Sequence, residues 1–307
     1  MYPPRRMTNR PQYRRPLTIS LLSLLIGTAL FYACTGTAKP PAPSSIIKKE
    51  THVITIASFN IRNFSNKSRD EKELKYIALL LKPYDLIAIQ ELRDAEVLKR
   101  TLSILKGWGY DFGYEISSPV GHHVKELYAF LYRKDKIAVL QKGHVYDDTY
   151  DLFIREPFYA RFKAQNFDFI LLTVHILYGS GITQRRPELL ALSHVYDEIQ
   201  AKNPSEHDII VVGDFNLPPN DAGWTDFLRK PSMTYLIKPP AKTIITDTSL
   251  YDNFWFQTQF VREYAAQTGI IKFDEDIFHN DDPSAEKAVS DHRPIWAKFA
   301  VDDADDD

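Results

Sequence analysis

The sequence predicts an α+β fold in which β-sheets pack face to face and helices lie outside them. Two observations lead to this prediction. Short apolar runs rich in β-branched and aromatic residues recur along the body of the chain. Helical periodicity separates only some of these runs, so sheets packed on each other with helices outside explain the pattern best. The sequence contains no internal repeat and no sign of a second core.

The expected elements follow in order from local signals. Val53–Phe59 and Leu86–Ile89 are apolar runs of the kind found in buried strands. Between them, apolar residues recur at helical spacing from Leu74 to Leu81, and Lys82-Pro83 ends that helix. Further strands are expected at 128–132, 137–140, 158–162, 169–174, 209–212 and 295–299, with a second helix at about 188–200.

Composition and charge narrow the possible functions. The chain has 307 residues and 44% hydrophobic residues, which excludes global disorder. One cysteine and 12 glycines exclude disulfide scaffolds, cysteine zinc clusters and collagen-like repeats. Five arginines precede Cys34, and the other 33 basic residues accompany all 40 acidic ones. An acidic body cannot hold nucleic acid by a broad basic surface, so any phosphate contact must be local.

The N-terminus is predicted to direct export. Residues 1–33 combine a basic start with the uncharged run Leu17–Ala33. The Ala33-Cys34 junction and the small residues after it resemble a bacterial lipoprotein signal, in which Cys34 carries the lipid. An uncleaved membrane anchor is the alternative. Both place the body at the outer face of a bacterial membrane, periplasmic or cell-surface, with secretion as a further alternative.

Three further segments complete the expected organisation. Residues 34–50 form a Pro/Ser-rich linker, which we expect to be extended and polar. Residues 51–301 form the folded domain. Residues 302–307 form an acidic tail that is expected to be solvated; calcium binding there is an open, less favoured alternative.

Polar residues recur at the ends of the expected strands. Carboxylates and histidines are seldom buried without partners, and strand ends hold them rigidly around one cleft. Their repetition therefore predicts a functional site. The residues are Asn60, Gln90, Glu91, His175, Asp214, Asn216, Asp252, Ser290, Asp291 and His292.

An ordered set of motifs carries a family resemblance from about Val53 to Phe299. These motifs are SFNIRNF, DLIAIQELRD, KELYAFLYRKDKIAVL, REPFYARF, LLTVHI, VVGDFN, YDNFWF and SDHRPI. Together they resemble the endonuclease/exonuclease/phosphatase superfamily. QELRD with IREPF points to its deoxyribonuclease I-like branch. The resemblance implies a four-layer α/β/β/α sandwich of two mixed sheets and a divalent cation, Mg²⁺ with Mn²⁺ as the alternative.

The resemblance also implies roles for individual residues. Glu91 is expected to bind the metal, with Asn60 and Asp291 beside it, because hard cations prefer oxygen ligands. A solvent-exposed pair of Glu91 with Arg93 is the alternative. Asp214 is expected to be catalytic, either orienting the attacking water or polarising a histidine. The other implied residues are the catalytic pairs His292 with Asp252 and His175 with Glu126, and the phosphate- or DNA-binding residues Arg155, Asn216, Arg93 and Arg62.

The expected function is that of an exported, membrane-tethered, magnesium-dependent phosphodiesterase, most simply a DNA endonuclease. A purely structural ion pair of Arg155 with Glu156 is an alternative to phosphate binding. Val124 stands where the deoxyribonuclease branch has a minor-groove tyrosine, which weakens the case for tight duplex binding. A phosphatase or phospholipase C-type enzyme on a lipid or inositol-phosphate headgroup, and a non-catalytic binding protein, remain alternatives. DNA and the membrane are the expected partners, and the sequence indicates no protein partner.

The lipid anchor can be tested directly. If Cys34 is lipidated, radiolabelled palmitate enters the wild-type protein in a bacterial host and does not enter the Cys34→Ser variant. Equal labelling of the two proteins, measured after membrane extraction, would reject this prediction.

Overall fold

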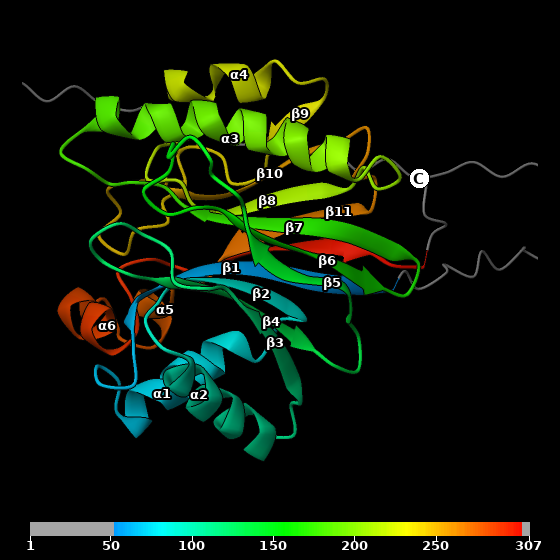
Figure 1. Ribbon diagram of the computed structural model, residues 1–307. Coiled ribbons are helices and arrows are strands. Elements are labelled where there is room, and N and C mark those ends of the chain that lie inside the picture. The colour runs from blue at the N-terminus through cyan, green and yellow to red at the C-terminus, as the bar shows by residue number, and fades with distance from the viewer. Residues whose placement is uncertain (1–51, 303–307) are drawn as a thin grey trace, which may run out of the picture. The chain divides into compact units, whose positions relative to one another are not determined.

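A computed structural model describes residues 52–302 of the chain. Within them, two six-stranded sheets pack face to face, and helices cover the two outer faces (Figure 1). This four-layer arrangement of two mixed sheets confirms the predicted fold class. The predicted export segment 1–33, the linker 34–50 and residues 303–307 of the acidic tail lie outside the described residues. None of the helices within 52–302 is both long enough and apolar enough to cross a membrane.

The first sheet has the strand order β11-β12-β1-β2-β4-β3. Only β1 and β2 pair in parallel. Helices α1 (Glu71–Leu81), α2 (Ala95–Gly107), α5 (Phe273–Asp276) and α6 (Asp282–Ala288) accompany this sheet (Figure 1). The strands are β1 (Val53–Phe64), β2 (Leu86–Leu92), β3 (Phe112–Ile116), β4 (Leu127–Arg133), β11 (Tyr264–Ile270) and β12 (Ile295–Ala300).

The second sheet has the order β5-β6-β7-β8-β10-β9, and only β7 and β8 pair in parallel. Helix α3 (Ile182–Lys202), the short 3₁₀ turn η1 (Ala222–Trp224) and α4 (Thr225–Leu228) cover it. The strands are β5 (Ala138–Val145), β6 (Phe158–Ala164), β7 (Phe167–His175), β8 (Ile209–Asp214), β9 (Met233–Tyr235) and β10 (Asp252–Gln257).

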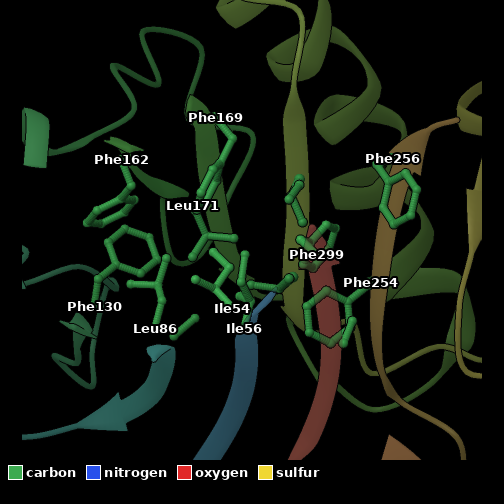
Figure 2. Close-up of a cluster of buried hydrophobic side chains, with 14 of the residues drawn as sticks. Ile54, Ile56, Leu86, Phe130, Phe162, Phe169, Leu171, Phe254, Phe256 and Phe299 are labelled. Carbon is green, nitrogen blue, oxygen red and sulfur yellow. The ribbon is translucent and has the colours of Figure 1, made fainter. Parts of the chain in front are cut away.

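The main core lies between the two sheets. Because side chains alternate along a strand, Ile54 and Ile56 of β1 enter this core, whereas Ala57 and Phe59 face the helices outside the first sheet. Figure 2 shows the inter-sheet layer, where Phe130 of β4 lies opposite Phe162 of β6. These two rings meet edge to face with centroids 5.5 Å apart. Both sheets are therefore held rigidly with respect to each other.

The two parallel strand pairs bring their carboxyl ends to one edge of the sandwich. Asn60 of β1 pairs with Gln90 of β2, and His175 of β7 pairs with Asp214 of β8. Gln90 then joins the sheets, because its Nε2 donates a hydrogen bond of 2.8 Å to the Thr173 hydroxyl. The polar residues predicted at strand ends thus converge on one place.

Close packing of β7 against β8 requires glycine at position 213. Gly213 has φ +144°, and a Cβ there would lie 2.1 Å from the Val174 carbonyl oxygen. Only glycine tolerates this conformation and this contact. The residue therefore sets the distance between the strands that carry His175 and Asp214.

We expect Gly213→Ala to lower the melting temperature by roughly 3–10 °C, because strained φ and a steric clash both oppose the native strand pairing. Gly107→Ala is the matched control, since a Cβ at Gly107 meets no atom within 4 Å. Thermal unfolding followed by circular dichroism measures both variants, and equal melting temperatures would contradict the prediction.

Candidate active site

A cleft of about 330 Å³ opens where the strand ends converge. Six of the residues that line it are among those predicted from the sequence: Glu91, His175, Asp214, Asn216, Asp291 and His292. Five others were not predicted: Tyr178, Ile244, Thr248, Ser249 and Tyr251.

Two buried histidine–carboxylate pairs lie at this cleft. His175 Nδ1 lies 2.9 Å from Glu126 Oε2, and His292 Nδ1 lies 2.9 Å from Asp252 Oδ2. A carboxylate only accepts hydrogen bonds, so in each pair Nδ1 carries the hydrogen when the imidazole is neutral. The Nε2 atom of each ring is then the one available for chemistry. Both predicted pairings are present in the structure.

Asp214 joins the two pairs. Its Oδ2 lies 3.5 Å from His175 Nε2 and 3.5 Å from His292 Nε2. The same oxygen accepts a 3.0 Å hydrogen bond from Asn60 Nδ2, and Oδ1 accepts one of 2.9 Å from the Asn216 backbone N–H. By this geometry the two Nε2 atoms are at most about 7 Å apart. That span suits two groups that act on opposite sides of one phosphate.

Burial and charge set the protonation of this cluster. Burial alone lowers the pKa of His292, but Asp252, Asp214 and Asp291 outweigh it and raise that pKa to about 10. Burial raises the pKa of Asp252. Burial also opposes ionisation of Glu126, yet its hydrogen bond to His175 and the nearby arginines bring the pKa of Glu126 below its usual value. The carboxylates around His292 thus favour the protonated form of its imidazole.

The residues present fit a hard divalent cation. The Asn60 Oδ1 atom is buried and has no hydrogen-bond partner within residues 52–302. The Glu91 carboxylate accepts a 3.4 Å hydrogen bond from Nδ2 of the same amide, and Glu91 is held at φ +59° in the left-handed region. Backbone strain of this kind persists where the surroundings impose it, often at functional sites. An amide oxygen and a carboxylate are ligands that Mg²⁺ accepts.

A second set of candidate ligand atoms adjoins this one through the hydrogen bond from Asn60 Nδ2 to Asp214. Ligand atoms of Asp214, Asp252 and His292 lie within 4.8 Å of one another. His292 and Asp252 already bond to each other, so metal binding there would cost that hydrogen bond. We therefore favour Glu91 and Asn60, with the cleft-lining Asp291, as the residues that would hold the ion.

Comparison with known proteins agrees with this geometry. The model of the Endonuclease/Exonuclease/phosphatase family matches residues 57–292, more than half of the chain. The chain belongs to this family. All of the predicted site residues lie within the matched range. Membership supports phosphodiesterase-type hydrolysis with a divalent metal, as the cluster of carboxylates and imidazoles does.

Relatives place the chain in the deoxyribonuclease I-like branch. A deoxyribonuclease of Thioalkalivibrio sp. (strain K90mix) is 31% identical over 263 residues, 80% of this chain and 71% of that protein. Human deoxyribonuclease-1 is 28% identical over 79% of this chain and 90% of its own length. A family protein from Bacteroides thetaiotaomicron shares the fold, with a TM-score of 0.56, 18% identity, and coverage of 82% of this chain and 99% of that one.

Arg155, predicted to bind phosphate, instead lies against the backbone behind His175. It donates hydrogen bonds of 2.8 Å to the His175 carbonyl and 3.0 Å to the Ile176 carbonyl. Its ion-pair partner is Glu126, at 3.8 Å, rather than the Glu156 of the structural alternative. The side chain is not among those that line the cleft. Arg155 therefore contacts both the backbone of His175 and the Glu126 carboxylate that pairs with its ring.

Two further predicted arginines are also engaged by carboxylates. Arg93 lies 3.4 Å from Glu126 and 3.7 Å from Glu91, so the alternative pairing of Glu91 with Arg93 is present alongside the metal-site geometry. Arg62 lies 3.2 Å from Glu286, outside the cleft. Neither guanidinium lies in the cleft as an open phosphate ligand.

The remaining predicted residue, Asn216, lines the cleft but already uses its amide. Its Nδ2 donates a 2.8 Å hydrogen bond to the Ile176 carbonyl, and its backbone lies at φ +50°. The unpredicted residue Tyr178 is two positions beyond Ile176. Its only signal in the sequence is that it follows the strand-end histidine by three residues.

Proposed function

We propose that this chain is a divalent-metal-dependent endonuclease that hydrolyses phosphodiester bonds of DNA. The observation that carries the proposal is the pair of histidine–carboxylate couples whose Nε2 atoms lie on either side of Asp214, in the cleft that Glu91 also lines. The deoxyribonucleases among the relatives support the choice of DNA. We also propose export and tethering through the N-terminal segment, on the strength of the sequence alone.

The first step assigned to the residues is water attack. Glu91, Asn60 and Asp291 would hold a divalent cation, whose positive charge would stabilise the charge that develops on the phosphate and would offset the carboxylates that raise the His292 pKa. His292 then accepts a proton from water at Nε2, while Asp252 fixes the ring and stabilises the imidazolium that forms. The water oxygen attacks phosphorus as its proton leaves.

The second step is departure of the 3′-oxygen. His175 enters this step as the imidazolium and donates its Nε2 proton to that oxygen as the phosphorus–oxygen bond breaks, which leaves a neutral ring whose Nδ1–H still donates to Glu126. Asp214 keeps both imidazoles oriented toward the phosphate. Arg155 contributes indirectly, because it fixes the His175 carbonyl and Glu126.

A non-catalytic binding protein would not need this arrangement. Glu91, His175, Asp214 and His292 are all present and line one cleft. A degenerate module is expected to lose at least one of them. A phosphatase or a headgroup phospholipase could use the same residues, so only a substrate comparison distinguishes these activities from DNA cleavage.

The metal and the substrate can be tested together. We expect the wild-type protein to nick supercoiled plasmid DNA in Mg²⁺ or Mn²⁺, and we expect EDTA to abolish the nicking. The nicking rate of Glu91→Ala should be lower by roughly 100-fold or more while the variant stays folded, because the cation loses its main carboxylate. Release of phosphate or headgroup from inositol phosphates and phospholipid vesicles is measured in parallel. Headgroup release without nicking would replace the proposed function, and full nicking in EDTA would reject the metal.

The roles of the two imidazoles are separable by leaving group. His175→Ala and His292→Ala should each lower the rate of DNA cleavage by about 100- to 10,000-fold, and the double variant should be only slightly slower than either. Nitrophenolate needs no proton to leave, so on a nitrophenyl diester His175→Ala should recover most of its rate and His292→Ala should not. The opposite pattern would exchange the roles. Recovery by neither would leave both histidines as phosphate-binding groups.

A further inference from the structure

One aromatic ring at the catalytic cleft is exposed. Tyr178 lines the cleft together with His175 and Asn216, and 57% of its surface is accessible. It follows β7 by three residues, so the rigid strand that carries His175 also fixes where this ring lies. The proposed mechanism gives Tyr178 no role.

The ring is supported from behind by a buried arginine. The Arg185 guanidinium carbon lies 4.0 Å from the Tyr178 ring centroid, and Arg185 itself is only 6% exposed. Arg185 donates 2.6 Å hydrogen bonds to the carbonyls of Tyr178 and Asn216. Tyr251 adds an edge contact, with ring centroids 6.5 Å apart. One face of Tyr178 is therefore occupied by the guanidinium and the ring is held in place, so its exposed surface includes the opposite face.

We propose that Tyr178 stacks on an unpaired nucleobase beside the phosphate being cleaved, so that this chain prefers single-stranded DNA. The inference rests on the proposed function. Aromatic rings with one open face bind bases of any sequence by stacking. The π-face of a paired base is covered by its neighbours in the duplex, and a base must leave the stack before it can lie on Tyr178.

Charge near the cleft points the same way. Duplex DNA is held mainly by many cationic contacts to phosphates. Arg93 is within 3.7 Å of Glu91 and within 3.4 Å of Glu126, and Arg62 pairs with Glu286. The 33 basic residues from Cys34 onward are outnumbered by 40 acidic ones. This surface therefore suits a substrate that is bound by one cation site and by stacking better than a duplex that needs cationic contacts to many phosphates.

The test compares two forms of one labelled oligonucleotide, single-stranded and annealed to its complement, at fixed Mg²⁺ and salt. The wild type should have the higher kcat/KM on the single strand. Tyr178→Ala should lower kcat/KM by roughly 5- to 100-fold on the single strand and by less on the duplex, because only the unpaired base stacks. Tyr178→Phe should keep the preference, since the ring remains.

Tyr150→Ala is the matched control, because Tyr150 is 81% exposed and does not line the cleft. It should leave both rates unchanged. A second readout uses small diesters: the wild type should favour thymidine 5′-nitrophenyl phosphate over methyl nitrophenyl phosphate, and Tyr178→Ala should reduce that ratio. Circular dichroism and melting temperature establish that each variant is folded.

The outcomes separate the two proposals. If the wild type cuts both DNA forms equally, or if Tyr178→Ala keeps the single-strand preference and the thymidine ratio, the stacking role is overturned and the nuclease proposal stands. If the wild type cuts neither form, the proposed function fails and the stacking role fails with it.

Discussion

The Asp214 carboxylate lies between two imidazoles, and much of the molecule serves to keep it there. Its Oδ2 is 3.5 Å from each Nε2, which makes one oxygen the common reference for both histidine–carboxylate pairs. Each imidazole thus faces the same carboxylate oxygen. Asn60 and the Asn216 backbone N–H hold the carboxylate from two further directions. The site thus acts as a unit of coupled groups rather than a set of independent residues.

Holding so many ionisable groups in a buried place opposes folding, and the sandwich provides the compensation. Glu126, Asp214 and Asp252 are all nearly inaccessible to solvent. Isolated buried charges are costly, so each is stabilised by a histidine, an arginine or backbone donors. The inter-sheet core supplies the rigidity, because its apolar residues fix both parallel strand pairs at one end. A looser scaffold would let these carboxylates move apart or take up protons.

The sequence predicted the residues that could carry out the chemistry better than the residues that hold them in position. Residues at the ends of apolar strands, such as His175 and Asp214, were predictable because strand ends of a sandwich meet at one edge. The backbone contacts of Arg155 could not be predicted, because the sequence shows a cation but not the carbonyl groups that it contacts. Tyr178 was missed because no motif marks an exposed ring whose role depends on Arg185 behind it. Helix α2 and strands β3, β9, β10 and β11 were not predicted either, and α3 begins at Ile182 rather than at about residue 188.

The supports also connect catalysis to substrate choice. The segment from His175 to Tyr178 is held by Arg155 at the carbonyls of His175 and Ile176, by Asn216 at the Ile176 carbonyl, and by Arg185 at the Tyr178 carbonyl. Glu188 of α3 accepts hydrogen bonds from the backbone N–H groups of Leu177 and Ile154, so the same helix also holds the segment that carries Arg155. A displacement of Tyr178 is therefore transmitted to the backbone that carries His175. If a nucleobase stacks on Tyr178, its binding also favours one position of His175, the proposed general acid. The four-residue segment from His175 to Tyr178 then couples substrate binding to proton transfer.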